Sequence, residues 1–155
     1  MTYHIADEPK PSGLAHLAVH PLWPLFGVMF AGTWLAWPWF AFNGFAVGSP
    51  TKWRELTAVI IGWLCSVVIL FAIIFAEHSK LLTSDVGRWV FLITKDIWII
   101  TVSYWIFTTQ TRTIELFQYT GGKLRNGLFA VVVSYFVSQK IAHVAPAFIV
   151  AVFGR

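Results

Sequence analysis

Four long apolar stretches, each close to the length of a membrane crossing, constrain this chain more than any other feature. They occupy residues 21–45, 56–76, 89–109 and 127–153. A helix needs roughly 20 apolar residues to cross the hydrocarbon core of a bilayer, and backbone groups cannot stay unpaired in lipid. The sequence therefore predicts an all-α membrane protein whose four transmembrane helices form two antiparallel hairpins.

Composition also indicates a membrane protein. Of the 155 residues, 57% are hydrophobic and 12% are charged. A soluble domain of this length leaves roughly a third of its unfolded-chain surface exposed, so we expect lipid to cover the apolar remainder. We expect residues 1–20 to form a polar tail with an apolar lead-in, and residues 21–155 to form one transmembrane domain. The first residues show no signal-peptide pattern, so we expect the apolar stretches to belong to the mature protein.

The net charge of +4 is spread over short loops, without a basic run that would suit a nucleic-acid backbone. Basic residues near the ends of the spans set membrane orientation. Because the loops after the first and third spans hold the larger share, we expect both loops in the cytoplasm and both termini on the opposite side. The loops hold Lys52, Arg54, Arg112, Lys123 and Arg125, and the opposite side holds Lys10, Lys80, Arg88 and Arg155.

Ionisable residues interrupt the last two apolar stretches. Lys95 and Asp96 lie in the third stretch, and Lys140 and His143 lie in the fourth. A rise of about 1.5 Å per residue places both lysines about 22–26 Å from the intervening loop, where their stems can extend to the far interface. Asp96 is then level with Lys140 and His143. We therefore expect an ion pair or hydrogen bond that either locks the two helices together or, if water reaches it, handles protons.

One face of the third span is polar. We expect a polar face to lie against protein or water rather than lipid. It suits a bundle interface held by hydroxyl groups, and its alternative role is a pore lining. The face comprises Thr94, Thr101, Tyr104, Thr108, Arg112 and Glu115.

Small residues recur every four positions in the second and fourth spans. Small residues at this spacing let helix backbones approach closely. We therefore expect both helices to pack through these positions. They are Ala58, Gly62 and Ser66 in the second span, and Ala130, Ser134, Ser138, Ala142 and Pro146 in the fourth.

His16 and His20 are candidates for a metal or axial haem site, because residues i and i+4 share one face of a helix. Pro21 disfavours helix at His20, however, and no carboxylate or cysteine lies beside the pair. The chain carries no catalytic motif, and Cys65, its single cysteine, cannot form an intramolecular disulfide. We therefore expect no enzymatic activity, no metal and no cofactor.

Residues 30–48, FAGTWLAWPWFAFNGFAVG, carry a family resemblance. This stretch resembles the first span of an uncharacterised family of small bacterial four-helix integral membrane proteins. Thr33 departs from the pattern, because that place often holds proline. The resemblance implies a multi-pass protein of a bacterial inner (plasma) membrane and implies no mechanism. The matching residues are Gly32, Asn43, Gly48, Gln110 and the Gly121-Gly122 loop.

Small packing residues, an aromatic surface and the lack of a catalytic set favour a non-enzymatic membrane interaction protein. It would act inside the bilayer as an accessory subunit, a regulator or an immunity-type protein, bound to a membrane-protein partner or to a second copy of itself. Two alternatives stay open. The polar face and Asp96 suit an oligomeric ion or proton channel or small transporter. The histidines, or the bulky Trp34, Trp37 and Trp39, suit a haem- or quinone-binding membrane subunit.

Overall fold

The computed structural model describes residues 9–79 and 85–144, and these residues are all-helical. The prediction of an all-α protein is confirmed, since the described parts contain no strand beyond one isolated bridge between Val19 and Arg125. The elements are η1 (Ala15–Leu17), α1 (Leu22–Ala31), α2 (Thr33–Val47), α3 (Lys52–His78), α4 (Asp85–Tyr119) and α5 (Leu128–Val144).

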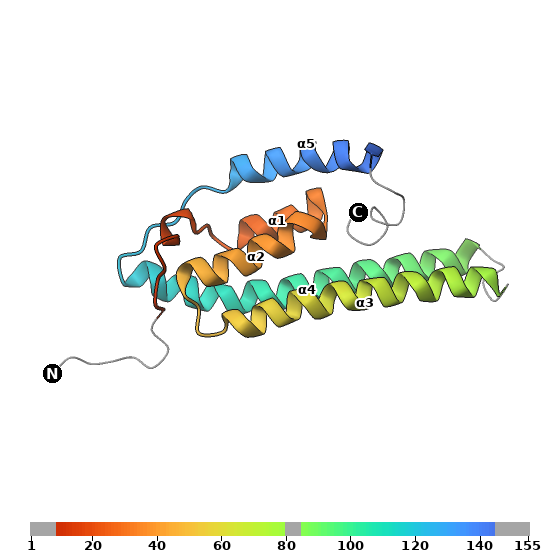
Figure 1. The fold of residues 1–155 in the computed structure, drawn as a ribbon, viewed down its shortest axis with the longest axis horizontal. Helices are drawn as coiled ribbons and strands as arrows, with labels where there is room; N and C mark the ends of the chain where they lie inside the picture. The colour runs from red at the N-terminus through yellow and green to blue at the C-terminus, as the bar shows by residue number, and fades with distance from the viewer. Residues whose placement is uncertain (1–8, 80–84, 145–155) are drawn as a thin grey trace.

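Two of the described helices, rather than the four expected, are long and apolar enough to cross a membrane. They are α3 and α4, which contain the predicted spans 56–76 and 89–109. They run side by side in Figure 1. The 17 described residues of α5 extend only about 25 Å at 1.5 Å per residue. The predicted fourth span, 127–153, runs on beyond the described residues.

The predicted first span is a helical hairpin instead of one helix. At Gly32 the backbone has a φ of 86°, a left-handed value that favours glycine, and the chain turns back there (Figure 1). An added Cβ at Gly27 of α1 would lie 3.3 Å from the Cβ of Ala36 in α2, so the two helices pack closely. They extend only about 15 Å and 22 Å, short of the roughly 30 Å of a hydrocarbon core. Pro38 lies inside α2.

This hairpin returns the chain to the end of the molecule from which it came. Residues 10–19 therefore lie beside the loops that follow α2 and α4, rather than at the opposite end as expected. The backbone N–H of Lys10 donates to the carbonyl of Gly48 at 3.3 Å, and the N–H of Arg125 donates to the carbonyl of Ala18 at 2.8 Å. The four-span arrangement placed this segment at the other end because it treated residues 21–45 as one helix rather than a hairpin.

Trp37 holds the α1–α2 hairpin on α3 and α4. The side chain is fully buried, and its Nε1 donates to the Oγ of Ser103 in α4 at 2.8 Å. The ring also lies over Gly62 of α3, where an added Cβ would be 2.7 Å from ring atoms. Because Gly62 has no side chain, the Trp37 ring, the largest fully buried side chain, fits directly against α3.

The last helix packs on α1 (Figure 1). Gly127 lies against the Trp23 side chain, and Val131 and Ser134 are buried. α1 packs against both α4 and α5. The expected hairpin of the last two spans would instead have required α4 and α5 to contact each other directly. That hairpin pairing is replaced by packing of α5 on α1.

We predict that Gly62→Ala lowers the stability of the fold. The added methyl group meets a Trp37 ring that its hydrogen bond to Ser103 holds in place, so we expect a loss of about 1–3 kcal/mol in the free energy of unfolding. Thermal unfolding in mild detergent, followed by tryptophan fluorescence, measures the change. Gly13→Ala is the control, because nothing lies within 4 Å of its added Cβ. Equal unfolding temperatures for both variants would contradict the packing described.

Candidate functional site

The carboxylate of Glu55 is fully buried in the first turns of α3. Its Oε1 accepts hydrogen bonds from the hydroxyls of Ser49 and Thr51 at 2.9 and 2.7 Å. Its Oε2 accepts one from the Nε2 of Gln110 in α4 at 2.7 Å. An ionised carboxylate is satisfied by several such donors. The positive end of the α3 helix dipole also favours negative charge at this position.

Gln110 extends this set of hydrogen bonds to α2 and to the N-terminal segment. Its Nε2 also donates to the carbonyl of Phe40 at 2.6 Å, while the Nδ2 of Asn43 donates to its Oε1 at 3.4 Å. Asn43 binds the backbone of Val19 twice, because its Oδ1 accepts from the N–H at 2.9 Å and its Nδ2 donates to the carbonyl at 2.8 Å. The buried polar cluster, defined as Asn43, Ser49, Thr51, Glu55, Gln110 and Thr113, thus joins residue 19 with α2, α3 and α4.

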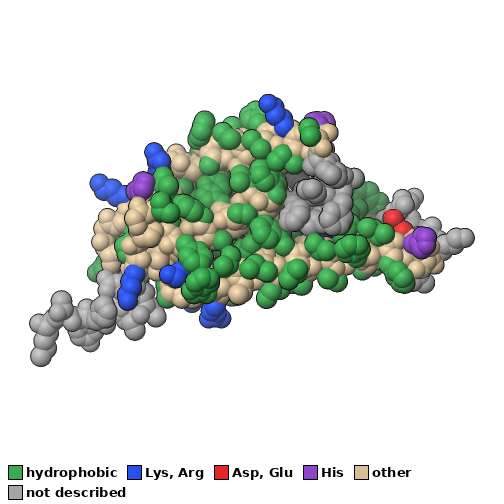
Figure 2. Space-filling model, viewed as in Figure 1, with side chains coloured by type: hydrophobic (Ala, Val, Ile, Leu, Met, Phe, Trp, Pro, Cys, Tyr) green, Lys and Arg blue, Asp and Glu red, His purple; other side chains and the backbone are tan. Residues whose placement is uncertain are grey.

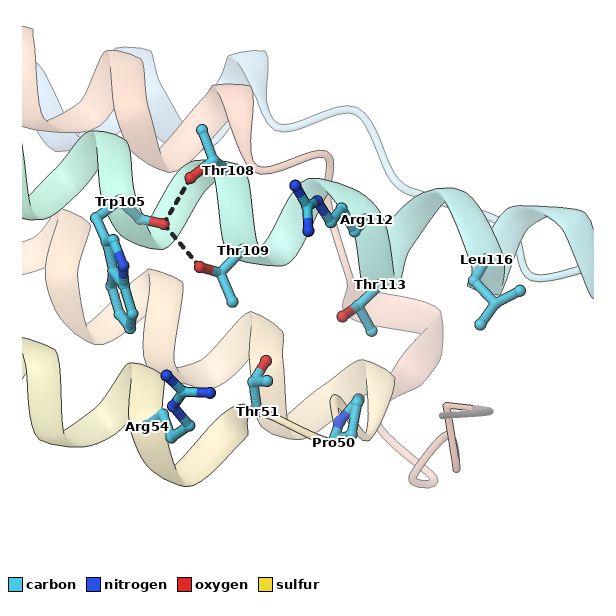
Figure 3. A pocket seen from close by; sticks show the side chains of 9 residues that line it. All are labelled: Pro50, Thr51, Arg54, Trp105, Thr108, Thr109, Arg112, Thr113 and Leu116. Carbon is cyan, nitrogen blue, oxygen red and sulfur yellow. Dashed lines mark hydrogen bonds between the residues drawn. The ribbon is translucent and has the colours of Figure 1, made fainter. Parts of the chain in front are cut away.

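A groove borders this cluster, between the start of α3 and the last turns of α4 (Figure 3). Its volume is about 760 Å³. Two exposed arginines line it, Arg54 from α3 and Arg112 from α4, and neither has an ion-pair partner among the described residues. Thr51 and Thr113 belong to both the groove and the cluster. The other lining residues are Pro50, Trp105, Thr108, Thr109 and Leu116.

The structure keeps Asp96 on α4 apart from Lys140 and His143 on α5, the residues with which it was expected to pair. Lys95 is 7% exposed, whereas Asp96 is exposed and lines a smaller cavity of about 180 Å³ beside Gly32 and Thr33. Lys140 and His143 are exposed on α5, which packs on α1. Among the described side chains, no ion pair or hydrogen bond joins Asp96 to either residue of α5.

The polar face expected on α4 lies on the outside of the protein. Thr101 and Tyr104 are exposed, as are Thr94, Arg112 and Glu115, while Thr108 is half-buried. The threonine hydroxyls donate to carbonyls of their own helix, as Thr94 does to Val90 and Thr101 to Ile97. These hydroxyls therefore need no partner across an interface. The buried face of α4 is displaced from the polar one and comprises Lys95, Ile99, Ser103, Ile106, Gln110, Thr113, Ile114 and Phe117.

The small residues predicted to pack lie in different surroundings. In α3, Gly62 and Ser66 are buried and Ala58 packs against the core. In α5, Ser134 is buried, Ser138 is half-buried and Ala130 is exposed. The side chain of Ala142 and all of Pro146 lie outside the described structure.

The two candidate histidine ligands do not share a helix. His16 lies in η1 and its Nδ1 is 2.9 Å from the carbonyl of Gly13, whereas the Nδ1 of His20 accepts from the N–H of Leu22 at 3.3 Å. Within the described ranges no group of three or more histidine, cysteine or acidic side chains is placed to hold a metal ion.

Sequence analysis did not single out the residues at the centre of the buried cluster. Glu55, Ser49 and Thr113 lie outside the predicted spans and belong to no recognised motif. Gln110 was named only through the family resemblance. The available signal was spacing, because Ser103, Gln110 and Thr113 recur in α4 with Ile99, Ile106 and Phe117 at intervals of three or four residues. That spacing marks a buried helical face that carries polar groups.

Comparisons with protein-family models, with curated proteins and with solved structures find no match for this chain.

We predict that Gln110→Leu destabilises the protein strongly. The substitution leaves Glu55 Oε2 buried without its Gln110 donor and removes a second hydrogen bond to the Phe40 carbonyl, and an unsatisfied buried group costs about 1–3 kcal/mol or more when charged. We expect the free energy of unfolding to fall by about 2–4 kcal/mol, measured by thermal unfolding in detergent. Gln118→Leu is the matched control, since Gln118 is exposed on the same helix. Similar effects of the two substitutions would refute this role of Gln110.

Proposed function

We propose that this chain is a non-enzymatic integral membrane protein, of a bacterial inner membrane, that acts by binding a partner protein inside the bilayer. The apolar surface supports membrane insertion. Only 17% of the most apolar stretch of α3 and 22% of that of α4 is buried within the protein. Exposed apolar side chains cover much of the surface in Figure 2. Such a surface requires lipid or another protein against it.

Charge supports an orientation for the inserted protein. Lysines and arginines gather at the end of the molecule where α3 begins and α4 finishes (Figure 2), and excess basic charge favours the cytoplasmic side. In this orientation α3 and α4 cross the membrane, and the α1–α2 hairpin enters from the cytoplasmic side and returns to it. The basic residues at this end are Lys10, Lys52, Arg54, Arg112, Lys123 and Arg125.

Asp96 is the observation on which the protein partner rests. It lies 11 residues after the start of α4, about 16 Å along the helix, and it is exposed among the apolar residues Ile93, Ile97 and Ile100. A carboxylate facing hydrocarbon at this depth is costly, and such groups usually pair with protein. Lys95 offers electrostatic compensation from one side. A partner helix that brings a cation or hydrogen-bond donor to this depth would cover the exposed side.

This proposal covers the accessory, regulatory and immunity-type roles, all of which require a partner at this surface. A second copy of the chain is one form of that partner. The hydroxyls of Thr94 and Thr101 bond within α4, so the exposed face gives less support to a pore lining.

We predict that Gly13 and Lys123 are accessible from the same side of the membrane. In a Cys65→Ser background, Gly13→Cys and Lys123→Cys should react with an impermeant thiol reagent from the cytoplasmic side, and Ser79→Cys from the other side. All three positions are exposed. Labelling in spheroplasts and inverted vesicles measures this. Two full hairpins of crossing helices would instead place Gly13 opposite Lys123.

We predict that a photo-crosslinking residue at Ile93 or Ile100 captures a protein partner in native membranes. Both side chains flank Asp96 and are more than half exposed. Asp96→Leu should reduce capture about three- to twentyfold, because polar contacts between helices in membranes contribute about 0.6–1.7 kcal/mol. Thr94→Val, an exposed change two residues away on the opposite side of α4, should leave capture unchanged. Absence of any captured protein, or proton flux in liposomes that depends on Asp96, would contradict the proposal.

A further inference from the structure

The groove between α3 and α4 has the features of an anion site that the partner interaction does not use. We propose that it binds the phosphate group of an anionic phospholipid from the cytoplasmic leaflet. The proposal rests on the membrane insertion and orientation proposed above, and it is independent of the protein partner.

Two arginines line the groove, Arg54 from α3 and Arg112 from α4, and both side chains are exposed. The Glu55–Gln110 hydrogen bond joins these two helices beside the groove. In Figure 3 Arg54 extends from α3 toward α4, and Arg112 lies farther along α4 in the direction of Leu116.

The chemistry of the lining favours phosphate. Guanidinium groups bind phosphate oxygens through paired hydrogen bonds. No aspartate or glutamate is among the described residues that line the groove, so nothing there competes for the two arginines. The hydroxyls of Thr108 and Thr109 already donate to the Trp105 carbonyl at 2.9 Å (Figure 3). The arginines are therefore the principal donors to a bound anion.

The shape of the groove favours a lipid over a small soluble anion. It runs from Trp105 to Leu116, about 16 Å along α4, and its volume of about 760 Å³ far exceeds a phosphate ion. Trp105 is 41% exposed at the end nearer the bilayer centre, where an indole ring suits the level of the lipid glycerol. A phospholipid would place its phosphate at the arginines and the start of its acyl chains beside Trp105.

The test measures retention of phosphatidylglycerol and phosphatidylcholine by the full chain purified in a neutral detergent. The wild-type protein should retain phosphatidylglycerol preferentially. Arg54→Gln with Arg112→Gln should reduce that preference about tenfold or more, because a basic residue near anionic lipid contributes about 1 kcal/mol. Lys123→Gln with Arg125→Gln is the matched control, since it removes equal charge from the same end outside the groove. The control should keep most of the preference.

Three results would overturn the proposal. An equal loss in the control pair would mean diffuse attraction by charge, and no preference in the wild-type protein would mean no site. Full competition by millimolar glycerol phosphate would assign the groove to soluble phosphate esters. Asp96→Leu separates the two proposals, because it should reduce partner capture severalfold and leave lipid preference intact. The double arginine variant, whose changes are exposed, should do the reverse.

Discussion

The carboxylate of Glu55 is the group on which the arrangement of the helices depends. Burying a charge is expensive unless its oxygens are satisfied, and here the donors come from two separate parts of the chain. Ser49 and Thr51 lie in the loop before α3, and Gln110 lies in α4. Gln110 in turn binds α2 through Phe40. Because each hydrogen bond requires a particular distance and angle, the cluster fixes the register of α2, α3 and α4. Apolar packing alone would fix that register less strictly.

The polar and apolar parts of the interior fix different features of the helix arrangement. Around Trp37, contact with Gly62 sets how closely the α1–α2 hairpin approaches α3. Around Glu55, hydrogen bonds set the axial position of the helices. The groove exists because both conditions are met: Thr51 and Thr113 form part of its wall and are held by the cluster, so Arg54 and Arg112 face one space.

The sequence predicts the long helices well, because an apolar run of about 20 residues has few other ways to be buried. Span 56–76 lies inside α3, and span 89–109 lies inside α4. The hairpin at Gly32 was missed because residues 21–45 form an equally long run, and Pro38 gave a stronger local signal for a bend than a glycine does. The choice between them depends on packing against α3 and α4, which no local pattern carries.

The candidate site was harder to predict. Glu55 lies in a charged stretch with Lys52 and Arg54, a pattern that is typical of surface residues. Its burial depends on the cover supplied by α2, whose Gly44 lies directly against the Glu55 carboxylate. The residues behind the family resemblance nevertheless have clear physical roles. Gly32 breaks the helix, Asn43 and Gln110 bond to each other, and a Cβ at Gly48 would collide with the backbone of Lys10.

The N-terminal segment has a consequence for biosynthesis. Asn43, which binds the backbone of Val19, is made 24 residues after it. Arg125, whose backbone N–H binds Ala18, is made 107 residues after that residue, since 125 − 18 = 107. At roughly 5–20 residues per second, the ribosome needs about 5–20 s to supply this last contact. In the orientation proposed above, residues 10–19 therefore wait on the cytoplasmic surface while both long helices enter the membrane, and they complete their contacts only when the segment before α5 has been made.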